Sequence, residues 1–184
     1  MFLNSNQKVE ILFPQKNEFT CQHSNCHFLL PMIQFVLMFN KLGKVRIAKW
    51  YSSIQQKERQ SIIKEVTRLV LRRDSQCCHF VEWKDIKLVY TRYASLYFLF
   101  AADQSDNEIF VLDTIHFFVE AMDQFFGDAC EIDVIYNFYY VYMLLDEIIL
   151  GGEVFETNTK NAIDSIVNQH HFIEDTEGEN SCEL

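Results

Sequence analysis

The sequence predicts an α/β fold of the α+β type, in which a five-stranded antiparallel sheet is flanked by helices. Three observations favour it: short β-rich runs joined by tight turns, apolar segments with helical spacing, and only 5 Gly and 2 Pro in 184 residues. Runs joined by such short turns must pair antiparallel, and helices must cover the faces of the resulting sheet. The predicted order is β-β-α-β-β-β-α-α, followed by a C-terminal helix.

The first predicted unit is a hairpin over residues 32–50. Met32 begins a strand pattern that runs to Asn40, and a second strand covers residues 45–50. The four residues between them form a turn in which Gly43 supplies the left-handed backbone angle. Residues 56–73 follow with apolar side chains on one stripe, which is typical of an amphipathic helix.

A tyrosine-rich hairpin over residues 87–102 is the strongest β signal in the chain, and a short strand over residues 79–83 precedes it. A helix is predicted over residues 108–126, with Asp106 or Asn107 as its cap and Gly127 at its end. Residues 131–150 are apolar nearly all round, which predicts one helix buried between layers. A shorter amphipathic helix is predicted from Thr159 to about His170.

One domain is expected over residues 32–170. Residues 1–31 are predicted to be a disordered or mis-started N-terminal extension, and residues 171–184 an acidic disordered tail. The formal net charge of −10 argues against non-specific nucleic-acid binding, which depends on Lys and Arg. The apolar runs over residues 26–40 and 134–145 fall below the ~18 residues of a membrane-spanning helix. The six cysteines are expected to be free thiols in a reducing compartment.

Two clusters of Cys and His residues raise the alternative of a small metal- or thiol-dependent enzyme. Cys21, His23, Cys26 and His27 offer zinc-type ligands, but their spacing matches no common zinc pattern. The run Cys77-Cys78-His79 places neighbouring side chains on opposite faces of a strand, which is poor geometry for a catalytic pair. We therefore predict no catalytic residue, no metal site and no cofactor.

Several motifs in order along the chain carry a family resemblance. They are Lys49-Trp50-Tyr51, Leu88-Val89-Tyr90 with Leu96-Tyr97-Phe98, Ile115-His116, Cys130-Glu131-Ile132-Asp133, Asn137-Phe138-Tyr139 and Asp146-Glu147. With these residues the chain resembles, from Met32 to about Gln169, the small (sigma) subunit of clathrin adaptor complexes, a family with a longin-like fold. Further motifs make it most similar to the type-one, trans-Golgi and endosomal branch: Lys57-Glu58-Arg59, Glu82-Trp83-Lys84-Asp85, Tyr93-Ala94-Ser95 and Gly151-Gly152-Glu153-Val154.

The resemblance implies a non-enzymatic subunit of a heterotetrameric adaptor in vesicle-mediated protein transport. Its implied partners are the N-terminal solenoid of a large adaptin subunit and cytosolic cargo tails that carry acidic dileucine signals. Clathrin would be reached only through the complex, which would be cytoplasmic and peripheral on trans-Golgi and endosomal membranes and on coated vesicles. Nucleic acid is not an expected partner. A plasma-membrane sigma chain and a coatomer zeta-like subunit remain alternatives.

The family's signal-binding residues map by resemblance onto eight positions. A basic contact for the acidic residue of the signal maps to Arg46. The apolar pocket for the leucines maps to Tyr93, Ala94, Leu96, Val119, Ala129, Ile132 and Val134. Ala129 is smaller than the family's usual Val, which would widen the pocket, and Asp128 adds a negative charge at its rim.

Overall fold

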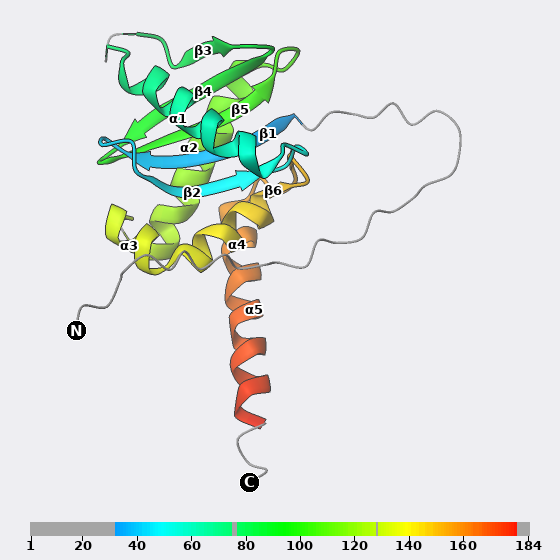
Figure 1. Ribbon diagram of the computed structural model, residues 1–184. Coiled ribbons are helices and arrows are strands. Elements are labelled where there is room, and N and C mark those ends of the chain that lie inside the picture. The colour runs from blue at the N-terminus through cyan, green and yellow to red at the C-terminus, as the bar shows by residue number, and fades with distance from the viewer. Residues whose placement is uncertain (1–31, 75–76, 128, 180–184) are drawn as a thin grey trace, which may run out of the picture.

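The computed structural model describes residues 32–74, 77–127 and 129–179, with the side chains described up to residue 169 (Figure 1). The elements occur in the order β1, β2, α1, β3, β4, β5, α2, α3, α4, β6, β7, α5. Five strands form one antiparallel sheet in the spatial order β2-β1-β5-β4-β3. The predicted α+β class with a five-stranded antiparallel sheet and flanking helices is therefore confirmed.

The sheet is built from hairpins that β1 and β5 join at its centre. The strands are β1 (Ile33–Asn40), β2 (Val45–Trp50), β3 (Phe80–Trp83), β4 (Ile86–Tyr93) and β5 (Leu96–Asp103). β1 pairs with β5 in the register Phe39 with Tyr97, although the two strands lie far apart in the sequence. This pairing places the turn after β1 beside the turn before β5.

Each face of the sheet buries its own apolar cluster, because alternate side chains of a strand point to opposite sides. Phe35, Leu37 and Phe39 of β1 pack with Ile62, Val66 and Val70 of α1 (Gln56–Leu71). Val36 and Met38 face the other side, where α2 (Glu108–Phe126), α4 (Phe138–Ile148) and α5 (Thr159–Glu179) cover the sheet. Figure 1 shows α1 on one side of the strands and α2 on the other.

The segment that was predicted as one helix over residues 131–150 is broken in the structure. α3 (Glu131–Tyr136) ends at Asn137, whose φ of −110° and ψ of 31° are not helical, and α4 begins at Phe138. Asn has a lower helix propensity than the apolar residues on either side of it, which favours a break at this position. The last two residues of the predicted helix form β6 (Ile149–Leu150), which pairs with β7 (Glu153–Val154) around Gly151 and Gly152.

The C-terminal helix is longer than the sequence indicated. It was predicted to end near His170, before a disordered tail over residues 171–184, but α5 continues to Glu179. No proline interrupts residues 171–179, and each further residue adds one hydrogen bond to a helix that already exists. The extension over residues 1–31 lies outside the described residues.

Side-chain contacts hold α4 against the edge strand β2. Because α3 directly precedes α4 in the chain, these contacts also set the position of α3. The Tyr142 hydroxyl accepts a hydrogen bond from the Ala48 amide and donates one to its carbonyl, both at 3.2 Å. Lys49 Nζ lies 2.6 Å from Asp146 Oδ1. These contacts also occupy backbone groups that an edge strand would otherwise leave open for pairing.

Substitution of Gly43 by alanine should lower the free energy of unfolding by about 2 kcal/mol. Gly43 has a φ of +76°, and an added Cβ would lie 3.1 Å from Thr67 Cγ2. Gly151→Ala is the matched control, because Gly151 has a φ of +64° but open space around it, so only the backbone cost of about 1 kcal/mol applies. Urea unfolding of both variants measures the difference. Equal losses would show that crowding against α1 is unimportant.

Candidate functional site

The two hairpin turns and the start of α3 meet at one end of the sheet. Asn40, the last residue of β1, pairs with Leu96, the first residue of β5. The Asn40 side-chain oxygen accepts hydrogen bonds from the Leu42 and Lys44 amides, both at 3.0 Å, which closes the β1–β2 turn. Its side-chain nitrogen donates to Glu131 Oε1 at 3.1 Å. One side chain therefore joins the hairpin turn to α3.

The β4–β5 turn contains a strained residue. Tyr93 pairs with Leu96, so Ala94 and Ser95 alone make the turn. Ala94 has a φ of +50°, a left-handed conformation that residues other than glycine rarely adopt. Arg92 Nε donates to the Ala94 carbonyl at 3.2 Å. Such strain is held only where the surroundings fix the backbone, and it is frequent at binding sites.

The connection from α2 to α3 is held by short-range polar contacts. Gly127, with a φ of +66°, ends α2, as the sequence predicted. The Ala129 amide donates to Asp123 Oδ1 at 3.2 Å. Cys130 caps α3, with its amide donating to Asp133 Oδ2 at 2.9 Å. These contacts place Ala129 and Glu131 opposite the β4–β5 turn.

A shallow hollow lies between the β4–β5 turn and the α2–α3 connection. Its free volume is about 30 Å³, room for a water or two but not for a leucine side chain. The lining residues come from β4, β5, the turn between them, α2 and the start of α3. They are Tyr93, Ala94, Ser95, Leu96, Phe98, Met122, Asp123, Ala129, Cys130 and Glu131.

Arg46 of β2 lies next to this hollow and forms an ion pair with Glu131. Arg46 Nη2 and Nε lie 2.7 and 3.0 Å from the same carboxylate oxygen, Glu131 Oε1. Both side chains are largely covered, with 16% and 24% of their surface exposed. The hydrogen bonds from Arg46, above all, hold the pKa of the Glu131 carboxyl below its usual range. The guanidinium therefore already binds a carboxylate from its own chain.

Five of the eight predicted site residues lie at the hollow or beside it. Tyr93, Ala94, Leu96 and Ala129 line it, and Arg46 reaches it through Glu131. Burial raises the pKa of the Tyr93 hydroxyl, and the nearby Asp123 adds to that shift.

The other three predicted residues do not line the hollow. Val119 and Val134 are buried, with 7% and 1% of their surface exposed, in the same core cluster as Leu96 and Met122. Ile132 points outward and is 61% exposed, because it lies on the solvent side of α3. Asp128 lies outside the described residues.

Sequence reasoning missed Asn40, Glu131 and Met122. Glu131 binds Arg46 and accepts a hydrogen bond from Asn40, and Met122 lines the hollow from α2. A carboxylate that begins a helix next to a capping residue was a usable signal for Glu131, because such positions favour acids. No sequence signal could have placed Asn40 beside Glu131, since the two residues lie far apart in the chain and meet only in the folded structure.

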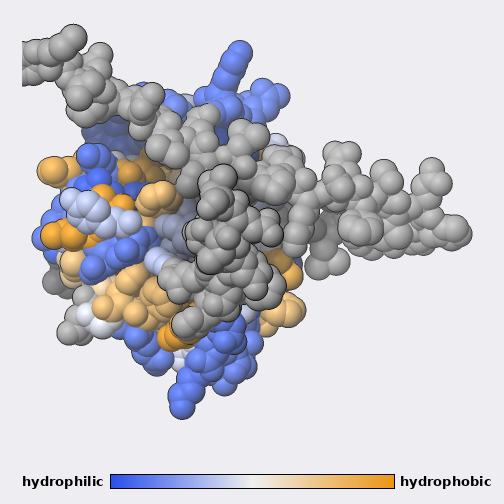
Figure 2. All heavy atoms as spheres, turned by 90° about the horizontal axis from the view of Figure 1, so that it is seen from below, coloured by the Kyte–Doolittle hydropathy of each residue, from blue (hydrophilic) through white to orange (hydrophobic). Residues whose placement is uncertain are grey.

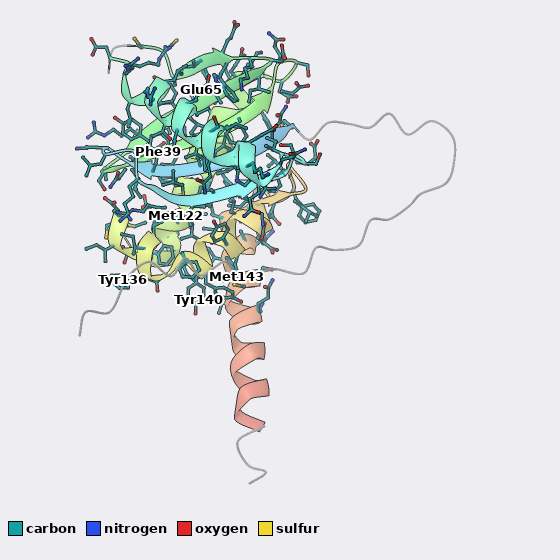
Figure 3. All side chains as sticks on the ribbon, viewed as in Figure 1. Phe39, Glu65, Met122, Tyr136, Tyr140 and Met143 are labelled. Atoms are coloured by element: carbon teal, nitrogen blue, oxygen red, sulfur yellow. The ribbon has the colours of Figure 1, made fainter. Side chains whose placement is uncertain are left out.

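Apolar side chains are exposed on the helices beneath the hollow. We call this group the α3–α4 patch: Ile132, Ile135, Tyr136, Phe138 and Tyr139. Tyr136 is 80% exposed. Figure 2, which views the molecule from below, shows hydrophobic residues gathered on this face. In Figure 3, Tyr136 and Tyr140 point away from the sheet, whereas Phe39 and Met122 point inward.

The Cys and His clusters do not assemble into a catalytic or metal site in the part of the chain that the structure describes. His79 Nδ1 donates to the Tyr90 carbonyl at 3.0 Å, and the Cys78 thiol contacts Arg73 Nη2 at 3.4 Å. No group of three or more potential metal ligands occurs among the described residues. The Cys21–His27 cluster lies outside them. None of the described helices is long and apolar enough to cross a membrane.

Comparison with known families and proteins agrees with this architecture. Residues 32–172 match the family described as clathrin adaptor complex small chain. Among solved structures, a chain in a homology model of the full-length AP-3 complex, in a stretched open conformation, aligns with a TM-score of 0.63 and 30% identity. The alignment covers 80% of this chain and 99% of that chain.

Individual relatives have closer sequences. The AP-1 complex subunit sigma-2 of Arabidopsis thaliana is 47% identical over 143 residues, which is 78% of this chain and 88% of that protein. The AP-1 complex subunit sigma-3 of Homo sapiens is 47% identical over 135 residues, or 73% of this chain and 88% of the relative. Both matches span most of the described domain.

Removal of the Arg46 guanidinium should reduce the loss of stability in acid. The folded-state pKa of Glu131 lies below its unfolded value, so this carboxylate stabilises the fold above the unfolded pKa, and that contribution disappears as the pH falls through the folded pKa. Arg46→Gln should therefore lose less free energy of unfolding between about pH 6 and pH 3 than the wild type does. Urea unfolding at both pH values measures this.

Lys160→Gln is the control for this experiment, because Lys160 is exposed and far along the chain on α5. It should keep the acid sensitivity of the wild type. If Arg46→Gln kept it as well, the Arg46–Glu131 pair would not be formed in solution.

Proposed function

The chain belongs to the family of clathrin adaptor complex small chains, which are structural transport subunits and not enzymes, and on that premise we propose that it is the sigma subunit of a heterotetrameric type-one adaptor. In this proposal it binds acidic dileucine signals in the cytosolic tails of cargo at trans-Golgi and endosomal membranes. The observation that carries the proposal is an apolar hollow beside a guanidinium, both held by one end of the sheet. The AP-1 names of relatives at 47% identity favour this branch over plasma-membrane and coatomer subunits.

The leucine side chains of the signal would occupy the hollow after it widens. Its volume of about 30 Å³ is too small for a leucine as it stands. Met122 lines it, and the unbranched methionine side chain has three rotatable bonds with which it can vacate or fill space. Each buried leucine contributes about 1.5–3 kcal/mol, from which the cost of ordering the peptide is subtracted. Weak binding, suited to reversible cargo selection, follows.

The acidic residue of the signal would bind Arg46. That guanidinium now contacts Glu131 Oε1 through two of its nitrogens, which is the kind of contact a carboxylate from a peptide would make. An incoming acid must therefore either displace Glu131 or share Arg46 with it. Glu131 repels a second carboxylate in both cases, so it weakens acid binding in this proposal.

The α3–α4 patch is the surface that we assign to the large adaptin subunit. It exposes three aromatic rings and two isoleucines within residues 132–139, and exposed clusters of large apolar side chains mark interaction sites. Aromatic residues are also enriched in protein interfaces. None of the patch residues lines the hollow, so the assigned interface and the candidate signal site use different side chains.

Ala129→Phe and Arg46→Glu should each weaken binding of an acidic dileucine peptide to the assembled adaptor by at least about tenfold. The first variant fills the hollow, and the second replaces the acid-binding charge with a repulsive one. Fluorescence anisotropy with a labelled peptide measures the affinity. Val134 is a poor test position, because Val134→Asp would bury an unpaired carboxylate and test folding instead.

Matched controls separate signal binding from assembly. Val167→Phe adds the same ring at an exposed position of α5, and Lys160→Glu reverses a charge there; both should bind the peptide like the wild type. Glu131→Gln should bind it up to about fivefold more tightly, because a competing charge is removed. Unchanged affinity in correctly assembled Ala129→Phe and Arg46→Glu adaptors would refute the assignment of this site.

Tyr136→Ser together with Ile135→Ser should reduce co-purification of the chain with a large adaptin subunit several-fold, because apolar contact area is lost from the α3–α4 patch. The control is Leu42→Ser, which removes an exposed apolar side chain of the β1–β2 turn, outside the patch. Pull-down of co-expressed subunits measures the effect. Full retention of the large subunit by the patch variant would place the interface elsewhere.

A further inference from the structure

A basic strip crosses the end of the sheet on the side of α1. Lys41 and Lys44 are exposed in the β1–β2 turn, and so are Arg68 of α1 and Arg72, the residue that caps the end of that helix. The ion pairs between described residues use other cations, namely Arg46, Lys49, Lys84 and Lys87. The four strip residues thus carry positive charge to the surface of a chain whose formal net charge is −10.

Packing of the hairpin turn against α1 brings these charges together. A Cβ at Gly43 would lie 3.1 Å from Thr67 Cγ2 and 3.3 Å from Leu71 Cδ1, so the turn rests on this part of the helix. Arg68 and Arg72 each follow one of these contact residues, and their spacing of four places them on one stripe beside the turn.

The tip of the turn presents an apolar side chain between the two lysines. Leu42 is 90% exposed, more than any other large hydrophobic residue of the described part of the chain. The Asn40 side-chain oxygen accepts hydrogen bonds from the Leu42 and Lys44 amides, both at 3.0 Å, and so fixes the backbone of the turn. An apolar tip flanked by lysines on a fixed turn is therefore a constant feature of this surface.

We propose that the β1–β2 turn is a membrane contact, in which Leu42 enters the interface of an anionic bilayer and Lys41, Lys44, Arg68 and Arg72 bind lipid phosphates. A bilayer supplies both parts of the chemistry that this surface requires: negative charge at the headgroups and an apolar layer directly beneath them. Lysine stems can lie along that apolar layer while their ammonium groups stay at the phosphates.

The location of the turn fits this role and rests in part on the proposed function. Asn40 links the turn to Glu131 and, through it, to Arg46, so the membrane contact and the candidate signal site share one end of the sheet. The cytosolic tail of a membrane-bound cargo protein begins at the bilayer surface, so a signal in that tail lies near the membrane. A membrane contact at this end would hold the hollow within reach of a signal in such a tail.

Vesicle co-sedimentation of the full chain tests the proposal. Phosphatidylcholine vesicles that contain phosphatidylserine should bind the chain, whereas vesicles of phosphatidylcholine alone should not. Lys41→Glu with Lys44→Glu should lower binding at least about tenfold, since each cation near an anionic surface contributes roughly a fivefold effect. Leu42→Ser should lower it a few-fold further, and the loss should persist at high salt, where screening removes the charge contribution.

The controls carry the same changes elsewhere on the chain. Lys57→Glu with Lys160→Glu changes the net charge equally, and Ile109→Ser removes another exposed apolar side chain. Both should bind vesicles like the wild type. All substituted side chains are exposed, so unchanged thermal unfolding is expected and is measured for every variant.

We call Lys41→Glu with Lys44→Glu the tip variant. If it bound vesicles as well as the control Lys57→Glu with Lys160→Glu, the proposal would be overturned, since net charge alone would then explain the effect. Loss of another subunit, and not of vesicles, from an assembled adaptor with the tip variant would identify an acidic protein segment as the occupant and overturn it too. Peptide binding in solution is measured separately. An adaptor that binds vesicles through the tip but binds no dileucine peptide would contradict the proposed signal recognition alone.

Discussion

The pairing of β1 with β5 is the constraint on which the rest of the structure depends. β1 is buried on both faces, and its register with β5 sets Asn40 opposite Leu96. Without that register the two hairpin turns would not meet. The hollow and the Arg46–Glu131 pair lie at the end of the sheet that this long-range contact between strands builds.

Charge at the site is arranged around a single carboxylate. Glu131 accepts hydrogen bonds from Arg46 and Asn40 and so connects β2, β1 and α3. The same contacts that stabilise this corner of the fold occupy the guanidinium that we assign to the signal. The Arg46 guanidinium therefore serves both stability and the proposed binding. The carboxylate of a ligand contributes to the binding free energy only the difference between its own contact with Arg46 and the contact that Glu131 loses. This favours weak, exchangeable binding.

The three surfaces that we assign lie on different parts of the molecule. The hollow faces the β4–β5 turn, the α3–α4 patch lies on the helices beneath it, and the basic tip projects from the β1–β2 turn next to α1. A subunit on the helices, a cargo peptide in the hollow and a bilayer at the tip would not compete for the same residues. Such a separation is what a scaffold that joins a coat to a membrane requires.

The fold class, both main hairpins and the first residues of α1, α2, α3 and α5 could be predicted from the sequence, because alternation, amphipathic spacing and residues such as Gly43, Asn107 and Gly127 act locally. The resemblance to the adaptor small-chain family predicted Arg46 and the four site residues that line the hollow. The break at Asn137 is a local feature that the nearly continuous apolar pattern of residues 131–150 hid. The burial of Val119 and Val134, the exposure of Ile132 and the Arg46–Glu131 pair appear only in the folded structure. Burial and ion pairing arise between segments far apart in the chain, and local patterns carry no information about which of them meet.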